Sequence, residues 1–166
     1  MFFEKLPTRC KEMLFEFLNP CFPYQIDDKA LVVDTVDFSY ELCESPIETM
    51  FNFAFDLLAD SKKTKGRLWL LPQEVIKTSG GNYRADFLFS SYECDYGQDY
   101  KEYNLVIECD GHDFHERTKQ QVVRDNQRTM DLKKAGYDVI RFSGSQIYND
   151  PFKCANDVLD YIITKI

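Results

Sequence analysis

Four groups that can bind a metal ion or transfer a proton crowd into residues 105–126 of this chain. An apolar run is followed there by Glu108, Asp110 and a glycine, and both histidines of the chain, His112 and His115, come next. Carboxylates at the end of an apolar strand need a partner, because burial penalises their charged form. A divalent cation is the least costly partner for them. The segment therefore predicts a metal-dependent phosphodiesterase.

Asp86 is expected to approach Glu108 from a neighbouring strand. Residues 83–90 and 103–109 are aromatic and aliphatic runs joined by a polar segment, so they predict two antiparallel strands. Two carboxylates brought this close repel each other, and one would take up a proton unless a cation bound between them. We expect Mg²⁺ (or Mn²⁺), held by Asp86, by Glu108 and by a backbone carbonyl between them. The alternative for Asp86 is an ion pair with Arg84 or another basic residue.

A histidine is the candidate proton acceptor, because a neutral imidazole near a metal-bound water can act as a general base at neutral pH. His115, which lies beyond the glycine turn, is favoured for this role. His112 lies closer to the turn, and we expect it to be a polar loop residue.

Glu48 and Gln73 each have two open interpretations. Glu48 follows Ser45 by three residues, so it either closes a capping box at the start of a helix or points towards the metal site. The second interpretation rests on its helical spacing from Phe51 and Phe55, which places it on a partly apolar face. Gln73 follows an apolar run, and it either donates to a phosphate or water or marks the end of a strand.

The net charge of −8 argues against a protein that binds nucleic acid through general basicity. The charge is uneven, however, since residues 61–68 hold four basic residues and no acid, and residues 117–134 hold six basic residues and two acids. The alternative interpretation for each segment is a solvated charged face. Arg141 is expected either to pair with a carboxylate or to contact the DNA backbone. Within the second segment the candidate phosphate contacts are Arg117, Lys119, Arg124 and Arg128.

Hydrophobic periodicity and helix signals predict an α/β core in residues 45–166. Residues 1–44 are expected to form an acidic N-terminal extension that is helical at first and then irregular. The expected helices cover residues 2–18, 45–59, 117–135 and 151–166, and the expected strands cover residues 67–78 with an interruption at Pro72, 83–90, 103–109 and 137–142.

Composition places the chain among ordinary domains, with 166 residues of which 44% are hydrophobic and 15% aromatic. Its six cysteines form no CxxC pair and no cysteine–histidine zinc pattern, so we expect reduced, mostly buried thiols in a cytoplasmic protein. The first residues lack the apolar stretch of a signal peptide, and no run is long enough to span a membrane.

The order of these motifs resembles a known pattern over about residues 44–150. It is similar to the very-short-patch-repair endonuclease-like branch of the PD-(D/E)XK nuclease superfamily. The pieces that carry the resemblance are Glu48 in SPIE, Gln73, Asp86 in RADF, the ECDG turn with His115, Arg124–Asp125 and the closing GYDVIRF.

The resemblance implies a restriction-endonuclease-like fold, with a central mixed sheet flanked by helices, and Mg²⁺-dependent hydrolysis of phosphodiester bonds. It matches Asp86 to the metal aspartate and Glu108 to the second acidic position, with the Cys109 carbonyl as the backbone ligand. His115 matches the histidine that transfers the proton in the repair enzymes. Asp110 stands where the superfamily usually has lysine, which leaves the base role to His115 or to a second metal. The zinc ligands of the mismatch-repair members are missing, so mismatch recognition is not implied.

Two functions from different classes follow. The favoured one is a metal-dependent DNA endonuclease whose catalytic set comprises Glu48, Gln73, Asp86, Glu108, Asp110 and His115. The alternative is a non-catalytic nuclease-fold module that binds a protein or nucleic-acid partner, with the acidic N-terminal segment as the surface for a protein. Metal binding separates the two, because an inactive site has no reason to bind Mg²⁺ or Mn²⁺.

Overall fold

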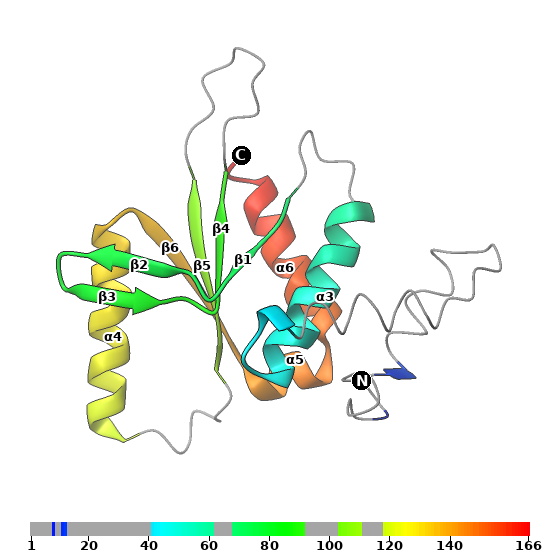
Figure 1. The fold of residues 1–166 in the computed structure, drawn as a ribbon, viewed down its shortest axis with the longest axis horizontal. Helices are drawn as coiled ribbons and strands as arrows, with labels where there is room; N and C mark the ends of the chain where they lie inside the picture. Colours follow the sequence, from blue (N-terminus) through cyan, green and yellow to red (C-terminus); the bar gives the residue numbers. More distant parts are fainter. Residues whose placement is uncertain (1–7, 9–10, 13–40, 62–67, 92–102, 111–117) are drawn as a thin grey trace, which may run out of the picture.

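A mixed four-stranded sheet lies at the centre of the computed structural model, which describes residues 8, 11–12, 41–61, 68–91, 103–110 and 118–166 (Figure 1). Among the described residues, no helix is long and apolar enough to cross a membrane. The elements, in chain order, are α3 (Pro46–Ser61), β1 (Leu71–Pro72), β2 (Val75–Thr78), β3 (Gly81–Arg84), β4 (Phe87–Ser90), β5 (Asn104–Asp110), α4 (Lys119–Lys134), β6 (Tyr137–Ser143), α5 (Gly144–Asn149) and α6 (Pro151–Ile163).

The sheet has the strand order β1-β4-β5-β6, and β2 and β3 form a separate antiparallel hairpin. Strand β4 is antiparallel to β1 and β5, whereas β5 and β6 are parallel, so the predicted mixed sheet flanked by helices is confirmed. The register pairs Phe87 with Ile107 and, on the other side of β5, Glu108 with Arg141. Glu108 and Asp86 therefore meet where β4 begins and β5 ends.

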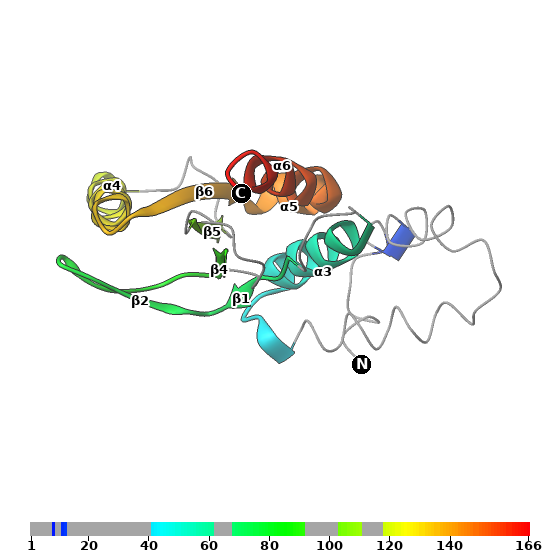
Figure 2. The same cartoon turned by 90° about the horizontal axis from the view of Figure 1, so that it is seen from above.

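Both faces of the sheet are covered, and this explains why the apolar run in β5 is continuous rather than alternating. Seen from above, α3, α5 and α6 lie on one side of β4 and β5, and α4 with the β2–β3 hairpin lies on the other (Figure 2). Leu105 and Ile107 face the first layer, in one core with Phe51 of α3. Val106 faces the second layer, in a smaller core with Leu132 of α4.

Two expected strands are each broken in two, and only the break near Pro72 was expected. Residues 83–90 were expected to be one strand, but the chain bends at Ala85 and Asp86 between β3 and β4. Residues 67–78 break at Gln73, directly after the interruption expected at Pro72, and the φ of Gln73, 57°, lies in the left-handed region. The breaks lie beside each other, because the Gln73 N–H donates to the Asp86 carbonyl at 3.0 Å.

The breaks let the hairpin leave the central sheet and pack on α4. Asp131 of α4, which is buried, anchors it by accepting a hydrogen bond from the Tyr83 hydroxyl at 2.6 Å, and the Gln127 amide of the same helix donates to its other oxygen at 2.8 Å. The hairpin turn comes so close that a Cβ on Gly80 would lie 2.1 Å from the Asp131 carboxylate. Only glycine fits that position without displacing the carboxylate.

The helices begin close to the positions that their local signals predict. Helix α3 starts after Ser45, α4 begins with a capping box from Thr118, and α6 has Pro151 in its first turn. The short helix α5 was missed, although Ser143 and Gln146 form a capping box at its start. The predicted helix over residues 2–18 and the rest of the proposed extension lie almost entirely outside the described residues.

Candidate active site

Asp86 lies in the bend before β4, with its carboxylate directed at the end of β5. Its Oδ2 accepts a hydrogen bond from the backbone N–H of Cys109 at 2.7 Å. The pKa of Asp86 is raised to about 6, chiefly by burial and also by the nearby charges of Glu48 and Glu108, while the Cys109 hydrogen bond and Arg128 oppose the shift. The raised pKa means that this position disfavours a negative charge unless a cation is present.

Glu108 is almost fully buried, with 4% of its surface exposed, and two arginines neutralise it. Arg128 of α4 places Nη2 2.7 Å from Oε1, and Arg141 of β6 places Nε 2.5 Å from Oε2. Arg141 is the register partner of Glu108 in the parallel pair β5–β6, so the two side chains share a face of the sheet. A buried carboxylate is tolerated here because both of its oxygens lie beside guanidinium groups, although among the described residues Oε1 accepts no hydrogen bond.

Glu48 lies at the start of α3, as its first interpretation predicts, and its carboxylate also reaches Gln73 at the strand break. Its Oε1 accepts a hydrogen bond from the Ser45 hydroxyl at 2.6 Å, and its Oε2 accepts one from the Glu44 N–H at 2.9 Å, so it caps the start of α3. The same Oε2 also accepts a hydrogen bond from the Gln73 side-chain amide at 2.7 Å. Glu48 therefore faces the break that contains Asp86, whose pKa it raises.

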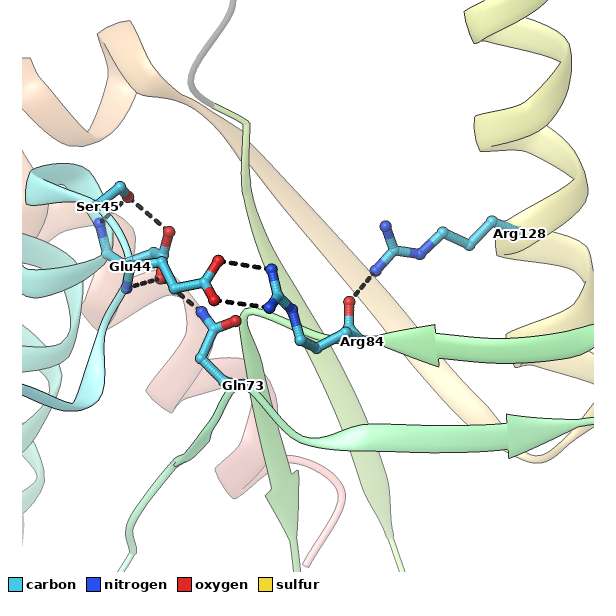
Figure 3. A network of polar contacts seen from close by, with 6 residues as sticks. Glu44, Ser45, Gln73, Arg84 and Arg128 are labelled. Carbon is cyan, nitrogen blue, oxygen red and sulfur yellow. Dashed lines mark hydrogen bonds and ion pairs between the residues drawn. The ribbon is translucent and has the colours of Figure 1, made fainter.

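Gln73 occupies a special backbone position and holds one polar atom without a hydrogen bond. Its left-handed φ turns the chain out of β1, and its amide nitrogen reaches Glu48 (Figure 3). Among the described residues, its buried Oε1 accepts no hydrogen bond. A buried acceptor of this kind is costly unless it is satisfied, so it is suited to contact a donor or a cation.

Arg84 pairs with Glu44 rather than with Asp86, which overturns the alternative interpretation of Asp86 as the partner of Arg84. Its two Nη atoms donate to the two carboxylate oxygens of Glu44 at 2.6 and 2.5 Å. Its backbone carbonyl accepts a hydrogen bond from Arg128 Nη2 at 2.5 Å. Figure 3 shows this continuous polar network, which runs from the start of α3 through Glu44 and Arg84 to Arg128 on α4.

The chain matches a known protein family. The sequence profile of the REase_MTES_1575 family, a restriction-endonuclease-like family, matches residues 73–162, more than half of the chain. The chain belongs to the REase_MTES_1575 family. The match includes Gln73, Asp86 and Glu108, and it supports a nuclease-type function within the PD-(D/E)XK superfamily. No curated protein and no solved structure matches the chain significantly.

For this member of the REase_MTES_1575 family, the structure brings together only part of the predicted site. Glu48, Gln73, Asp86 and Glu108 meet at the two strand breaks. Asp110 ends β5 one position beyond Cys109, partly exposed, opposite Ser143 of β6. The other predicted residues of the segment that follows β5, His112, His115 and Arg117, lie outside the described residues.

The predicted phosphate contacts on α4 separate into two kinds. Lys119 and Arg124 are exposed, as a contact with nucleic acid requires. Arg128 is not available to bind a phosphate in the same way, because its guanidinium group contacts Glu108 and the Arg84 carbonyl. Of the two interpretations of Arg141, pairing with a carboxylate is confirmed.

Two contacts of this site were not predicted from the sequence. Arg128 and Glu108 lie on different elements, and no local pattern links them. Glu44 was counted with the N-terminal extension, so its pair with Arg84 was not expected. The only sequence signal for the Glu44–Arg84 pair is the position of each residue, one beside the helix cap and the other two residues before Asp86.

Asp86→Asn is expected to stabilise the metal-free protein at pH 8. The folded-state pKa of about 6 exceeds the ordinary 3.8, so the wild type loses stability as the pH rises from about 4 to about 6, and the asparagine does not. Discounted for solvent screening of this half-buried group, the advantage is about 2 kcal/mol above pH 6 and vanishes below pH 4.

Urea unfolding of both proteins in EDTA, at pH 4 and pH 8, measures this difference. Asp157→Asn, on the exposed face of α6 in an ion pair with Lys153, is the matched control and should not share the gain. A destabilised Asp86→Asn protein at pH 8 would show that Asp86 is stabilising as a carboxylate, contrary to this expectation.

Proposed function

We propose that this chain is a metal-dependent endonuclease that hydrolyses phosphodiester bonds in DNA. The single observation that carries the proposal is the placement of Asp86, whose carboxylate is held by the Cys109 N–H at the end of β5, beside Glu108 and Glu48. Membership of a restriction-endonuclease-like family supports a nuclease rather than another use of this fold.

The residues at the two strand breaks fit a divalent cation. Asp86 is a carboxylate whose charge is disfavoured without one, and Gln73 Oε1 is a buried acceptor without a donor among the described residues. Asp86 and Glu108 are the proposed ligands, with the Cys109 carbonyl as the third oxygen and Mg²⁺ or Mn²⁺ as the ion. Within the described part of the chain, no three histidine, cysteine or acidic side chains are already gathered for an ion. When bound, the ion supplies an activated water and stabilises charge on the phosphate.

Further roles are assigned to the chain's own residues. His115 accepts the proton from the attacking water, because Asp110 occupies the position of the usual lysine. Arg117, Lys119 and Arg124 contact phosphates along the DNA backbone and therefore carry no sequence information. The assignment to the very-short-patch-repair-like branch belongs with this proposal, since it depends on His115.

The proposal also covers the domain organisation of the chain, a protein partner and the location of the protein in the cell. Residues 45–166 form the nuclease core, residues 1–44 are an extension that meets a protein partner, and the protein is cytoplasmic. The three described cysteines, Cys43, Cys109 and Cys154, are free and buried, which agrees with a reducing compartment.

One observation favours the second candidate function, a nuclease-fold module that binds a partner without cleaving it. Arg128 and Arg141 together neutralise Glu108, so the carboxylate already has the positive partners that a cation would provide. If these ion pairs persist, the site binds no metal and the protein acts only through its surface.

Cleavage and metal binding together test the proposal. Supercoiled plasmid incubated with the protein and Mg²⁺ or Mn²⁺ is expected to be nicked or linearised, and EDTA should stop the reaction. Calorimetry with Mn²⁺ is expected to show binding that Asp86→Asn removes. Binding of DNA without cleavage and without any Mn²⁺ binding would establish the non-catalytic module instead.

A further inference from the structure

We propose that Arg84 is a DNA phosphate contact at the edge of the active site, and that Glu44 occupies its guanidinium group in the free protein. This inference rests on the proposed endonuclease function, because it names a contact for the same substrate. Glu44 then acts as a built-in competitor that a phosphate of the DNA displaces.

The geometry of the Arg84–Glu44 pair resembles that of an arginine bound to phosphate. Both Nη atoms of Arg84 donate to separate oxygens of one carboxylate, at 2.6 and 2.5 Å. A phosphate presents two oxygens to the same fork, and this bidentate arrangement is the one by which arginine recognises phosphate. The fork of Arg84 is therefore already oriented for an anion with two oxygens.

The backbone of both residues is fixed to the active site. Arg84 lies two residues before Asp86, and its carbonyl accepts a hydrogen bond from Arg128, which contacts Glu108. The N–H of Glu44 donates to Glu48. In Figure 3 the guanidinium group of Arg84 lies between this cap of α3 and the strand that leads to Asp86. A phosphate bound to Arg84 would thus belong to DNA that reaches the carboxylates.

Exposure distinguishes Arg84 from the other arginines of the network. Its side chain is 54% exposed, compared with 29% for Arg128 and 20% for Arg141. Arg128 and Arg141 are committed to the buried Glu108, whereas the partner of Arg84 is itself 55% exposed. An exposed ion pair contributes little to stability, so exchanging Glu44 for a phosphate has a small cost.

The negative charge around the site makes the release of Arg84 from Glu44 important for DNA binding. Glu48 and Asp86 make the site acidic, and the chain carries a net charge of −8, so DNA is repelled unless cations lie where it docks. While Glu44 is paired with Arg84, that cation is cancelled. Removing the charge of Glu44 should therefore strengthen DNA binding by more than the removal of one acid from elsewhere on the surface.

Glu44→Gln and Asp157→Asn form a matched pair that tests this. Each removes one negative charge from an exposed ion pair, the first at the site and the second with Lys153 on α6. Binding of a short DNA duplex is measured by fluorescence anisotropy at low salt in EDTA, so no cleavage intervenes. Glu44→Gln is expected to lower Kd about 3-fold relative to Asp157→Asn, as the release of one surface ion pair allows.

Arg84→Ala completes a double-mutant cycle. It is expected to weaken binding and to reduce the slope of log K against log salt by about 1, because one phosphate contact is lost. Lys153→Ala, the control for loss of an exposed cation, should leave that slope unchanged. In the Arg84→Ala background, Glu44→Gln should lose its extra gain, since the two residues act through one contact.

Three results would overturn the inference. An equal effect of Glu44→Gln and Asp157→Asn, or a Glu44→Gln gain that persists without Arg84, would show only a general change of charge. In either case a wild type that binds and cleaves DNA leaves the proposed function standing. A wild type with no affinity for DNA at low salt in EDTA would remove the inference, and plasmid cleavage with Mg²⁺ or Mn²⁺ then decides separately whether the endonuclease function stands.

Discussion

Asp86→Asn is expected to abolish DNA cleavage while the protein remains folded. The substitution keeps an oxygen that accepts the Cys109 N–H, so the local geometry survives. It removes the negative charge that would hold the cation. Loss of a metal-assisted step removes several kcal/mol of transition-state stabilisation, which corresponds to a rate loss on the order of 10³-fold.

Initial rates of plasmid cleavage at saturating Mg²⁺ measure this loss, and circular dichroism checks the fold. Asp157→Asn provides the control, because it removes an exposed carboxylate of α6 that takes no part in the site. Cleavage by Asp86→Asn within a few-fold of the wild-type rate would exclude Asp86 as a metal ligand and leave the activity without its proposed centre.

Arg128→Met is expected to destabilise the protein by about 2–4 kcal/mol, because it removes one of the two cations that neutralise the buried Glu108. Methionine retains the apolar part of the side chain, so the loss reports mainly on the charge. Arg141 still faces Glu108, which keeps the effect below that of a fully unpaired buried carboxylate. The bond to the Arg84 carbonyl, which ties α4 to the β2–β3 hairpin, is lost as well.

Arg124→Met is the matched control for this substitution, one turn earlier on the same helix and exposed. Its effect on urea unfolding should stay within about 0.5 kcal/mol, as for other surface positions. The double variant Arg128→Met with Glu108→Gln should lose less than the sum of the two single changes, since both belong to one ion pair. Equal stability of the Arg128 and Arg124 variants would show that Glu108 needs only Arg141.

Arg124 and Arg128 have different surroundings although their helical spacing places them on the same face of α4. The two residues are four apart, so the sequence treated them alike as phosphate contacts. Their different surroundings come from what packs beside each of them. Arg128 lies level with the end of β5, where the buried Glu108 attracts it, whereas Arg124 faces solvent.

Local signals in the sequence determined the elements and most of the candidate site. A continuous apolar run followed by two acids predicted a buried strand that ends in carboxylates, and Asn104–Asp110 is that strand. Ser45 and Glu48, three residues apart, predicted the start of α3, because a capping box is made within one turn. These predictions succeeded since each depends on residues that are neighbours in the chain.

Tertiary structure alone decided how the carboxylates are partnered. Glu108 and Arg141 are 33 residues apart, Glu48 and Gln73 are 25 apart, and the Arg84–Glu44 pair spans 40. Such pairs form only when strand register and helix packing bring the side chains together, and no local pattern encodes that distance. The break at Asp86 was hidden for the same reason, whereas Pro72 had signalled the break beside Gln73. Their backbones leave the sheet because the β2–β3 hairpin packs on α4 rather than continuing the strands beside it.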